Sequence, residues 1–359
     1  MEAETRKKRS PGKRIVKALI ALVIVIAVVL LGARIYFRLP VKDYYNASEA
    51  AFAIPGLAEG FVPQGLAYDG ESGCYLVGGY AKGSGVASPI YAVNRETGET
   101  VAHVTLANPD ETAFTGHAGG LAVWGDNVYV AGSGCLYVFD HKAILSAGID
   151  GLPVQWLNKI ETLLTPGDEE AGVPADSIGV AWVDIQEDDE GALVTVGEFY
   201  RDPNYPTPET HKFTDASGES LQALAITCRL SEDGLSLTPI RAYALPDLVQ
   251  GFTVHEGKIY LSTSWGVAFS HIDVYDEADL PDSLIQTLTV NGADIPLYAL
   301  GQSARSAAYR IAPMSEEIIF SDGKLLTMCE SASRKYYFGL LTGGQWCYAT
   351  DLSRMTPAE

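Results

Sequence analysis

Cysteine is scarce in this chain, with five among 359 residues. Five scattered cysteines are too few for the disulfide framework that stabilises small secreted domains. Cys329 ends one predicted strand and Cys347 begins the next, so a disulfide across that hairpin is one alternative. We interpret Cys74, Cys135 and Cys228 as small buried hydrophobic residues.

The sequence also lacks the short motifs that mark common reaction centres. It has no Gly-x-Ser-x-Gly, no His-Glu-x-x-His and no Cys-x-x-Cys. The glycine-rich stretch 78–85 does not match a phosphate-binding loop, and we interpret it as a connection between strands. Serine hydrolases, zinc proteases and nucleotide-binding proteins are therefore disfavoured.

Basic residues are rare beyond the N-terminus. Nine of the 25 Lys and Arg residues, and two of the 45 Asp and Glu residues, lie in residues 1–38. The remainder carries a formal charge of −27, whereas the whole chain carries −20. Such a surface repels nucleic acid and anionic lipid, so we expect no nucleic-acid partner. Solubility is the simplest reason for this charge, and binding of Ca²⁺ or a neutral polymer is compatible with it.

One long apolar run stands near the N-terminus. Residues 15–37 are long and apolar enough to span a bilayer. The basic residues 1–14 before them predict a cytoplasmic tail and a chain that continues outside. We therefore expect a single-pass anchor in the cell membrane, then a linker at 38–49 and an exported domain at 50–359. A cleaved signal peptide is the alternative.

The exported part contains a repeated four-strand pattern. Its opening phrases are QGLAY (64–68), GGLAV (119–123), IGVAW (178–182), QGFTV (250–254) and EEIIF (316–320). Each phrase is followed by a short Gly/Asp turn and two further strand-like runs. A repeat of this length built from short strands is typical of a β-propeller. The sequence predicts an all-β, five-bladed β-propeller preceded by one transmembrane helix.

The last repeat runs out of chain after its third strand. The segment AAFAIP (50–55) reads like the fourth strand RAYALP (241–246), so we predict that it closes the last blade beside residues 347–352. Closure matters because unpaired sheet edges favour aggregation. In the fourth repeat, Asn291-Gly292 predicts an inserted hairpin.

The predicted site lies on the face that carries the long connections, around the central channel. These connections are 199–220, 301–315 and 330–346, and loops longer than the geometry needs usually serve function. Strand starts and ends at that face supply polar and aromatic side chains. The candidate ligand-binding residues are Gln64, Tyr80, His117, Ser133, Gln250, Trp265 and Glu330.

Three chemistries are compatible with this set. The carboxylates Asp176, Glu198 and Glu316 are candidate catalytic groups of a glycoside hydrolase. His117, Asp176 and Glu316 are an alternative set of ligands for Ca²⁺. The remaining polar and aromatic residues are sufficient to bind a ligand without catalysis.

Each residue also has a structural interpretation. Asp176 can cap backbone N–H groups, His117 can serve as a structural hydrogen-bonding group, and Trp265 can pack between blades. Glu316 and Glu317 are adjacent in a strand, so only one of them can line the channel. Arg201, Arg334 and Lys335 are expected on solvated loops.

The phrases FVPQGLAYD (61–69), HAGGLAV (117–123), VQGF with LSTSWG (249–266) and APMSEEI with CESAS (312–333) resemble uncharacterised exported propellers of Gram-positive bacteria. The chain is similar, more loosely, to five-bladed furanosidase-type folds, which use carboxylates. It is also loosely similar to gluconolactonase-like propellers, which use a metal held by acidic groups. The sequence does not place a complete catalytic or metal-ligand set of either kind on matching positions.

The sequence thus favours a membrane-anchored, extracytoplasmic propeller. Its leading function is binding of a carbohydrate or another cell-envelope component at the channel mouth, with no resident cofactor. A glycoside hydrolase with paired carboxylates is the second hypothesis, and a Ca²⁺-dependent lactonase or esterase is the third.

Overall fold

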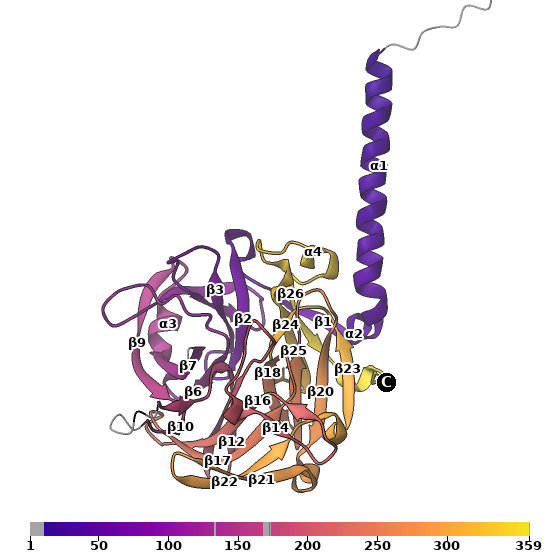
Figure 1. Cartoon of the computed structure of the whole chain (residues 1–359). Coiled ribbons are helices and arrows are strands. Elements are labelled where there is room, and N and C mark those ends of the chain that lie inside the picture. Colours follow the sequence, from indigo (N-terminus) through magenta and orange to yellow (C-terminus); the bar gives the residue numbers. More distant parts are fainter. Residues whose placement is uncertain (1–10, 133, 168–171, 173, 359) are drawn as a thin grey trace, which may run out of the picture.

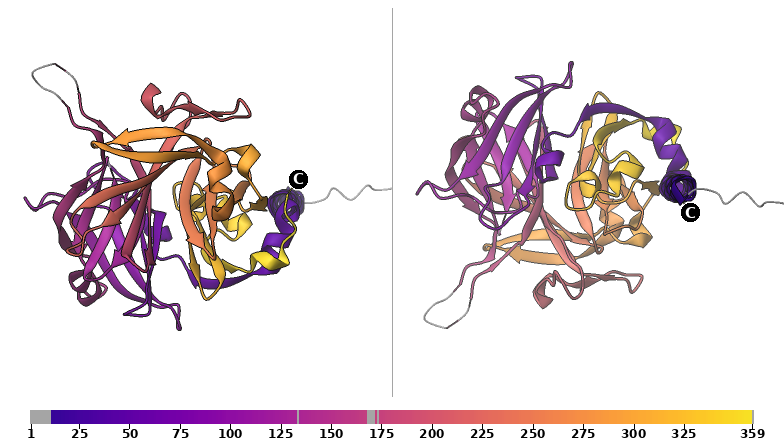
Figure 2. Two further views of the ribbon diagram at one scale, coloured as in Figure 1. Left: turned by 90° about the horizontal axis from the view of Figure 1, so that it is seen from below. Right: turned by 90° about the horizontal axis from the view of Figure 1, so that it is seen from above.

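The computed structural model describes residues 11–132, 134–167, 172 and 174–358. The protein is mostly β-structure, its fold is β-propeller-like, and one long helix stands at the N-terminus. Figure 1 shows the sheets arranged around a common centre, with α1 projecting away from them. Both views in Figure 2 place α1 at one edge of the β-rich body, beside the C-terminus.

The first two four-stranded antiparallel units form one eight-stranded sheet in the order β2-β3-β4-β5-β9-β8-β7-β6. The parallel pair β5–β9 joins them, and the end strands β2 and β6 meet again, so the sheet nearly closes on itself. Its strands are β2 (Phe61–Asp69), β3 (Cys74–Ala81), β4 (Pro89–Asn94), β5 (Thr100–Ala107), β6 (Leu121–Trp124), β7 (Asn127–Gly132), β8 (Cys135–Asp140) and β9 (Leu152–Glu161).

The next unit is the antiparallel series β12 (Val180–Asp188), β13 (Gly191–Glu198), β16 (Ala223–Leu230) and β17 (Leu237–Leu245). The predicted hairpin at Asn291-Gly292 is confirmed as β21 (Leu284–Val290) and β22 (Ala293–Ala299). We expected it within the fourth repeat, and that placement is wrong. The strand β22 instead pairs in parallel with β17 and thereby covers the outer edge of the third unit.

The fourth unit is β18 (Val249–His255), β19 (Lys258–Thr263), β20 (Ser270–Asp276) and β23 (Ala307–Ile311). Its last strand lies in the stretch expected to be a connection. The final unit is β24 (Ser315–Ser321), β25 (Lys324–Cys329), β26 (Trp346–Thr350) and β1 (Ser48–Ala53). The predicted pairing of the leading strand with the trailing one is confirmed, with Ala50 opposite Tyr348.

The segment expected to be a linker packs against the sheets. After α1 (Pro11–Arg38) come η1 (Leu39–Val41) and α2 (Lys42–Ala47), whose Tyr44 is fully buried and hydrogen-bonds Thr327 Oγ1 at 2.6 Å. By length and composition, α1 is able to cross a membrane, and its apolar window is unburied. At its end, the Phe37 ring stacks on Phe338 with centroids 5.4 Å apart.

Short elements decorate the connections between strands. The helical ones are η2 (Leu57–Glu59), α3 (His141–Ser146), η3 (Glu209–His211), η4 (Glu277–Ser283), η5 (Gln302–Ala304), η6 (Glu330–Ala332), α4 (Gly339–Thr342) and η7 (Leu352–Arg354). Short strands form the pairs β10 (Leu163–Thr165) with β11 (Asp176–Ser177) and β14 (Phe213–Thr214) with β15 (Ser220–Leu221).

Glycine in the repeated phrase allows the innermost strands to approach closely. A Cβ on Gly65 would lie 2.8 Å from Leu121 Cγ, one on Gly120 would lie 2.5 Å from Val183 N, and one on Gly251 would lie 2.8 Å from Glu317 Cα. Each of these three glycines therefore touches the next innermost strand. The contacts run from β2 to β6, β12, β18 and β24 and back to β2.

The fifth phrase has Glu317 where three others have this glycine. Its carboxyl Oε2 accepts hydrogen bonds from the backbone N–H of Leu66 and, at 2.9 Å, of Leu121. Burial raises the pKa of Glu317 well above its ordinary value, and the N–H groups of Leu66, Leu121 and Val183 oppose this rise. One side chain on β24 thus reaches β2 and β6 and lies close to β12.

Candidate functional site

A cavity of about 870 Å³ lies where the innermost strands begin. Its polar lining includes Gln64, Gln250, Glu316, Glu330 and Lys335, and its aromatic lining includes Tyr80, Phe199, Tyr205, Trp265 and Tyr336. A cavity of this size with a few convergent polar groups is suited to a small ligand.

Irregularities in the innermost strands aim side chains into the cavity. Strand pairing skips Gln64 between Pro63 and Gly65, and it skips Ala181 and Gln250 in the same way. A further irregularity spans Glu316 and Glu317. A β-bulge re-aims a side chain locally. Gln64, Ala181, Gln250 and Glu316 therefore line the cavity, whereas Glu317 points toward the neighbouring strands.

Most of the sequence-predicted ligand-binding residues come together here. The residues that line the cavity are Gln64, Tyr80, His117, Gln250, Trp265 and Glu330, together with the candidate catalytic residue Glu316. Ser133 lies outside the described residues. Asp176 and Glu198 are not part of the cavity lining. Phe199, Tyr205, Lys335 and Tyr336 line it without having been selected from the sequence.

Two carboxyl groups, those of Glu316 and Glu330, line the cavity and affect one another. The pKa of Glu316 is raised well above its ordinary value, mainly by burial and secondarily by the charge of Glu330. Burial also raises the pKa of Glu330 to about 7, although Lys335, Tyr336 and Gln64 oppose the rise. Gln64 Nε2 donates to Glu330 Oε2 at 3.2 Å. The pair therefore holds a proton near neutral pH, as two adjacent buried acids do.

Aromatic rings around the cavity hold cationic side chains. Lys335 was expected on a solvated loop, but its Nζ donates to Tyr80 OH at 2.5 Å and lies 5.0 Å and 4.9 Å from the Tyr80 and Tyr336 ring centroids. Arg201 lies 4.0 Å from the Trp265 ring centroid. His117 stacks on Tyr80. The pKa of His117 is lowered, mainly by burial and secondarily by the charge of Lys335. These ring faces attract positive charge.

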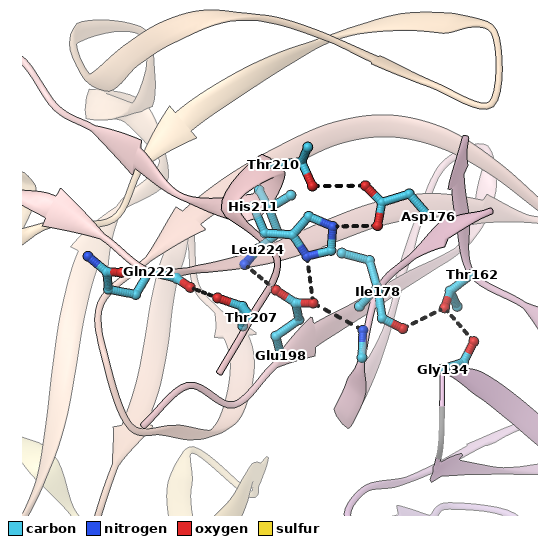
Figure 3. A network of polar contacts seen from close by, with 11 residues as sticks. Gly134, Thr162, Asp176, Ile178, Glu198, Thr207, Thr210, His211, Gln222 and Leu224 are labelled. Carbon is cyan, nitrogen blue, oxygen red and sulfur yellow. Dashed lines mark hydrogen bonds and ion pairs between the residues drawn. The ribbon is translucent and has the colours of Figure 1, made fainter. Parts of the chain in front are cut away.

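Asp176 and Glu198 meet at a residue that the sequence did not single out (Figure 3). His211 Nδ1 lies 2.8 Å from Glu198 Oε1, and His211 Nε2 lies 3.0 Å from Asp176 Oδ1. Glu198 also accepts from the N–H groups of Gly179 and Leu224. Burial lowers the pKa of His211, but bonding and charge from Glu198 and Asp176 outweigh burial, so the pKa is raised. This network fastens the 199–222 connection to its sheet.

The prediction placed Asp176 at the start of an innermost strand because the third repeat was aligned incorrectly with the others. The phrase IGVAW suggests that Gly179 is equivalent to Gly65 of the first repeat. In the structure Trp182 is the equivalent residue, because it pairs with Gly197 as Gly65 pairs with Gly78. The true innermost strand therefore begins at Val180, and Asp176 lies in the separate strand β11. His211 had no local signal, because it is a lone histidine in a long connection.

The proposed Ca²⁺ ligand set does not come together. His117 and Glu316 line the cavity, whereas Asp176 is bonded to His211 and Thr210. Across the described ranges, no group of three or more His, Cys, Asp or Glu side chains has the arrangement to hold a metal ion. Cys329 and Cys347 are both buried and are not bridged to each other, so the disulfide considered across their hairpin is not formed.

No protein-family model and no curated protein matches the chain. Among solved structures, it is similar to the GH43_1 enzyme from Xanthomonas citri complexed with xylose, at 12% identity and a TM-score of 0.39, over 88% of this chain and 91% of that one. A putative 6-phosphogluconolactonase from Bacteroides uniformis matches at 13% identity and a TM-score of 0.37, over 74% and 77%. BamB from Moraxella catarrhalis matches at 10% identity and a TM-score of 0.31, over 75% of this chain and 80% of that one.

The His211 network makes a testable prediction about protonation. We expect NMR titration to place the pKa of His211 above the ordinary histidine value of about 6.5. The Glu198→Gln variant should lower it, because an amide carries no charge. Stability that comes from this raised pKa is fully present below about pH 6.5 and is lost as pH rises through the folded-state pKa.

Two other histidines serve as internal controls in the same titration. Burial lowers the pKa of both His103 and His271, and neither value should respond to Glu198→Gln. A His211 that titrates at or below the ordinary value would contradict the proposed double ion pair.

Proposed function

We propose that this protein binds a carbohydrate or a related cell-envelope component in the cavity at the centre of its β-sheets. The observation that carries the proposal is the convergence of the bulged residues Gln64, Gln250 and Glu316 with an aromatic wall on one cavity of about 870 Å³. Amide and carboxyl groups suit the hydroxyls of a sugar, and the rings suit its apolar faces.

The aromatic wall includes a partly exposed ring, Trp265, over which the Arg201 guanidinium lies 4.0 Å from the ring centroid. The Phe199 ring stacks near Trp265, with centroids 6.0 Å apart, and Tyr205 meets Trp265 edge-on at the same distance. Trp265 keeps 37% of its surface exposed, although it lines the cavity. Trp265 is thus fixed by its neighbours and partly accessible, and a ligand that stacks on it would share the ring with Arg201 or displace that side chain.

We further propose a five-bladed propeller held outside the cell by α1. The closed series of contacts among β2, β6, β12, β18 and β24 supports a count of five, with β1 completing the last blade. The unburied apolar face of α1 supports a membrane anchor. Basic residues at 1–14 favour a cytoplasmic N-terminus, and the acidic remainder disfavours nucleic acid as a partner. The resemblance to exported propellers of Gram-positive bacteria agrees with this location.

Replacement of Trp265 by Ala tests ligand binding. With full-length protein in phosphatidylcholine nanodiscs, a screen of cell-wall and plant-type oligosaccharides should yield a ligand. Trp265→Ala should weaken its binding by about fivefold, because one stacking contact is worth roughly 1 kcal/mol. Calorimetric titration measures the change.

The matched control is Trp346→Ala. Trp346 is also 37% exposed, but it does not line the cavity, so its removal should leave the affinity unchanged. Equal losses in both variants, or a complete absence of saccharide binding, would contradict the proposed function.

A glycoside hydrolase is the second candidate, and the raised pKa of both Glu316 and Glu330 favours it. A catalytic acid needs a carboxyl that stays protonated near neutral pH, and these two groups meet that requirement. Asp176 and Glu198 are occupied by His211, so the candidate acid pair is now Glu316 with Glu330.

Under this hypothesis, hydrolysis of an aryl glycoside should fall as pH rises through about 7, where Glu330 loses its proton. Glu316→Gln and Glu330→Gln should each reduce kcat at least about a hundredfold, whereas Glu198→Gln should retain most activity. Activity that survives both cavity substitutions would exclude these residues as the catalytic pair.

A further inference from the structure

We infer that the cavity selects a saccharide that carries a free amino group, and that Glu316 and Glu330 hold the resulting ammonium ion. This inference rests on the proposed carbohydrate-binding function and narrows it from sugars in general to amino sugars. Three independent observations support it: the charge imbalance of the cavity, the behaviour of its aromatic walls and the charge of the surrounding surface.

The first observation is the charge imbalance. Glu316 is 3% exposed and Glu330 is 9% exposed, and both line the cavity. Among the described lining residues, Lys335 is the only Lys or Arg, so one permanent positive charge faces two carboxyls. A buried carboxylate without a compensating charge is costly, and the site relieves that cost by retaining a proton. A bound ammonium ion would replace that proton as the second positive charge.

The second observation is that the cavity walls already bind cations. The Lys335 ammonium lies about 5 Å from the centroids of both the Tyr80 and the Tyr336 ring, and the Arg201 guanidinium lies over Trp265. The ring faces are therefore used in the protein itself to stabilise positive charge. Lys335 donates to Tyr80 OH, and no hydrogen bond from it to either glutamate is found in the described part of the chain. The carboxyl oxygens remain the strongest acceptors available to a ligand.

The third observation is the electrostatic environment. Residues 39–359 carry a formal charge of −27, which raises the local concentration of cationic solutes and disfavours anionic ones. Acidic sugars and phosphorylated glycans are therefore poor candidates. His117 does not alter this conclusion, because burial and Lys335 lower its pKa and keep it neutral.

The exchange of a proton for an ammonium ion has a measurable signature. An amino sugar that arrives as an ammonium ion and binds between the two glutamates should displace protons from them below pH 7, the pH near which Glu330 is half protonated. A neutral sugar should displace none. Calorimetric titrations in two buffers with different ionisation enthalpies measure the number of protons released.

The experiment compares three β-1,4-linked tetrasaccharides that differ in the substituent at C2: glucose with a hydroxyl, N-acetylglucosamine with an acetamide and glucosamine with an ammonium. Full-length protein in phosphatidylcholine nanodiscs is titrated at two salt concentrations and at about pH 6, where the amino groups of the glucosamine tetramer carry their protons and Glu330 still holds its own. We expect the glucosamine tetramer to bind at least about tenfold more tightly than either neutral tetramer, with proton release.

Glu-to-Gln variants distinguish binding by the two cavity glutamates from a general attraction of cations to the acidic surface. Glu316→Gln and Glu330→Gln should each abolish the preference and reduce proton release, while binding of the neutral tetramers persists. Glu209→Gln removes an exposed carboxylate from the neighbouring 199–222 connection and should change nothing. Circular dichroism checks that each variant is folded.

The outcomes distinguish this inference from the proposed function. Equal binding of all three tetramers, or tighter binding of a neutral one, would overturn the amino-sugar inference and leave carbohydrate binding intact. A glucosamine preference that survives both cavity variants would also overturn it. If none of the three tetramers binds while another oligosaccharide does, the amino-sugar inference fails alone. If no saccharide binds, the proposed function fails with it.

Discussion

The buried carboxyl of Glu317 is the interaction on which the rest of the structure depends. Strands that meet around a common centre leave backbone N–H groups that point inward and have no ladder partner. Glu317 satisfies the N–H groups of Leu66 and Leu121 with one oxygen, and Val183 N–H lies close enough to lower its pKa. An unsatisfied buried N–H costs about 1–3 kcal/mol, so this one side chain compensates for a substantial penalty.

The same constraint positions the cavity. Gly65, Gly120 and Gly251 allow the strands to close tightly around Glu317, and the bulges beside them turn Gln64, Gln250 and Glu316 the other way. Adjacent residues of one strand thus serve two purposes: Glu317 stabilises the centre and Glu316 lines the cavity. The burial that makes the centre stable also raises the pKa of the cavity acids. Stability and candidate chemistry therefore have a common origin.

The sequence predicted the features that depend on local pattern. The opening phrases located the innermost strands β2, β6 and β18, because glycine is needed where backbones approach closely, and the similarity of 50–55 to 241–246 predicted the pairing of β1 with β26. Features set by tertiary packing were missed. The third repeat was aligned incorrectly at Gly179, because Trp182 stands where the other repeats have glycine. His211 was overlooked because only folding brings it between Asp176 and Glu198. Lys335 was assigned to solvent because nothing local indicates that its loop folds over the cavity.

Amide hydrogen exchange in β2 and β6 tests the central role of Glu317 most directly. Peptides that contain Leu66 and Leu121 should exchange at least about tenfold faster in Glu317→Ala than in the unmodified protein, because both N–H groups lose their acceptor. Glu317→Gln retains an acceptor oxygen and should show a smaller increase, while peptides from the distant hairpin β21–β22 should be unaffected. Exchange in β2 and β6 that is unchanged in Glu317→Ala would contradict the account.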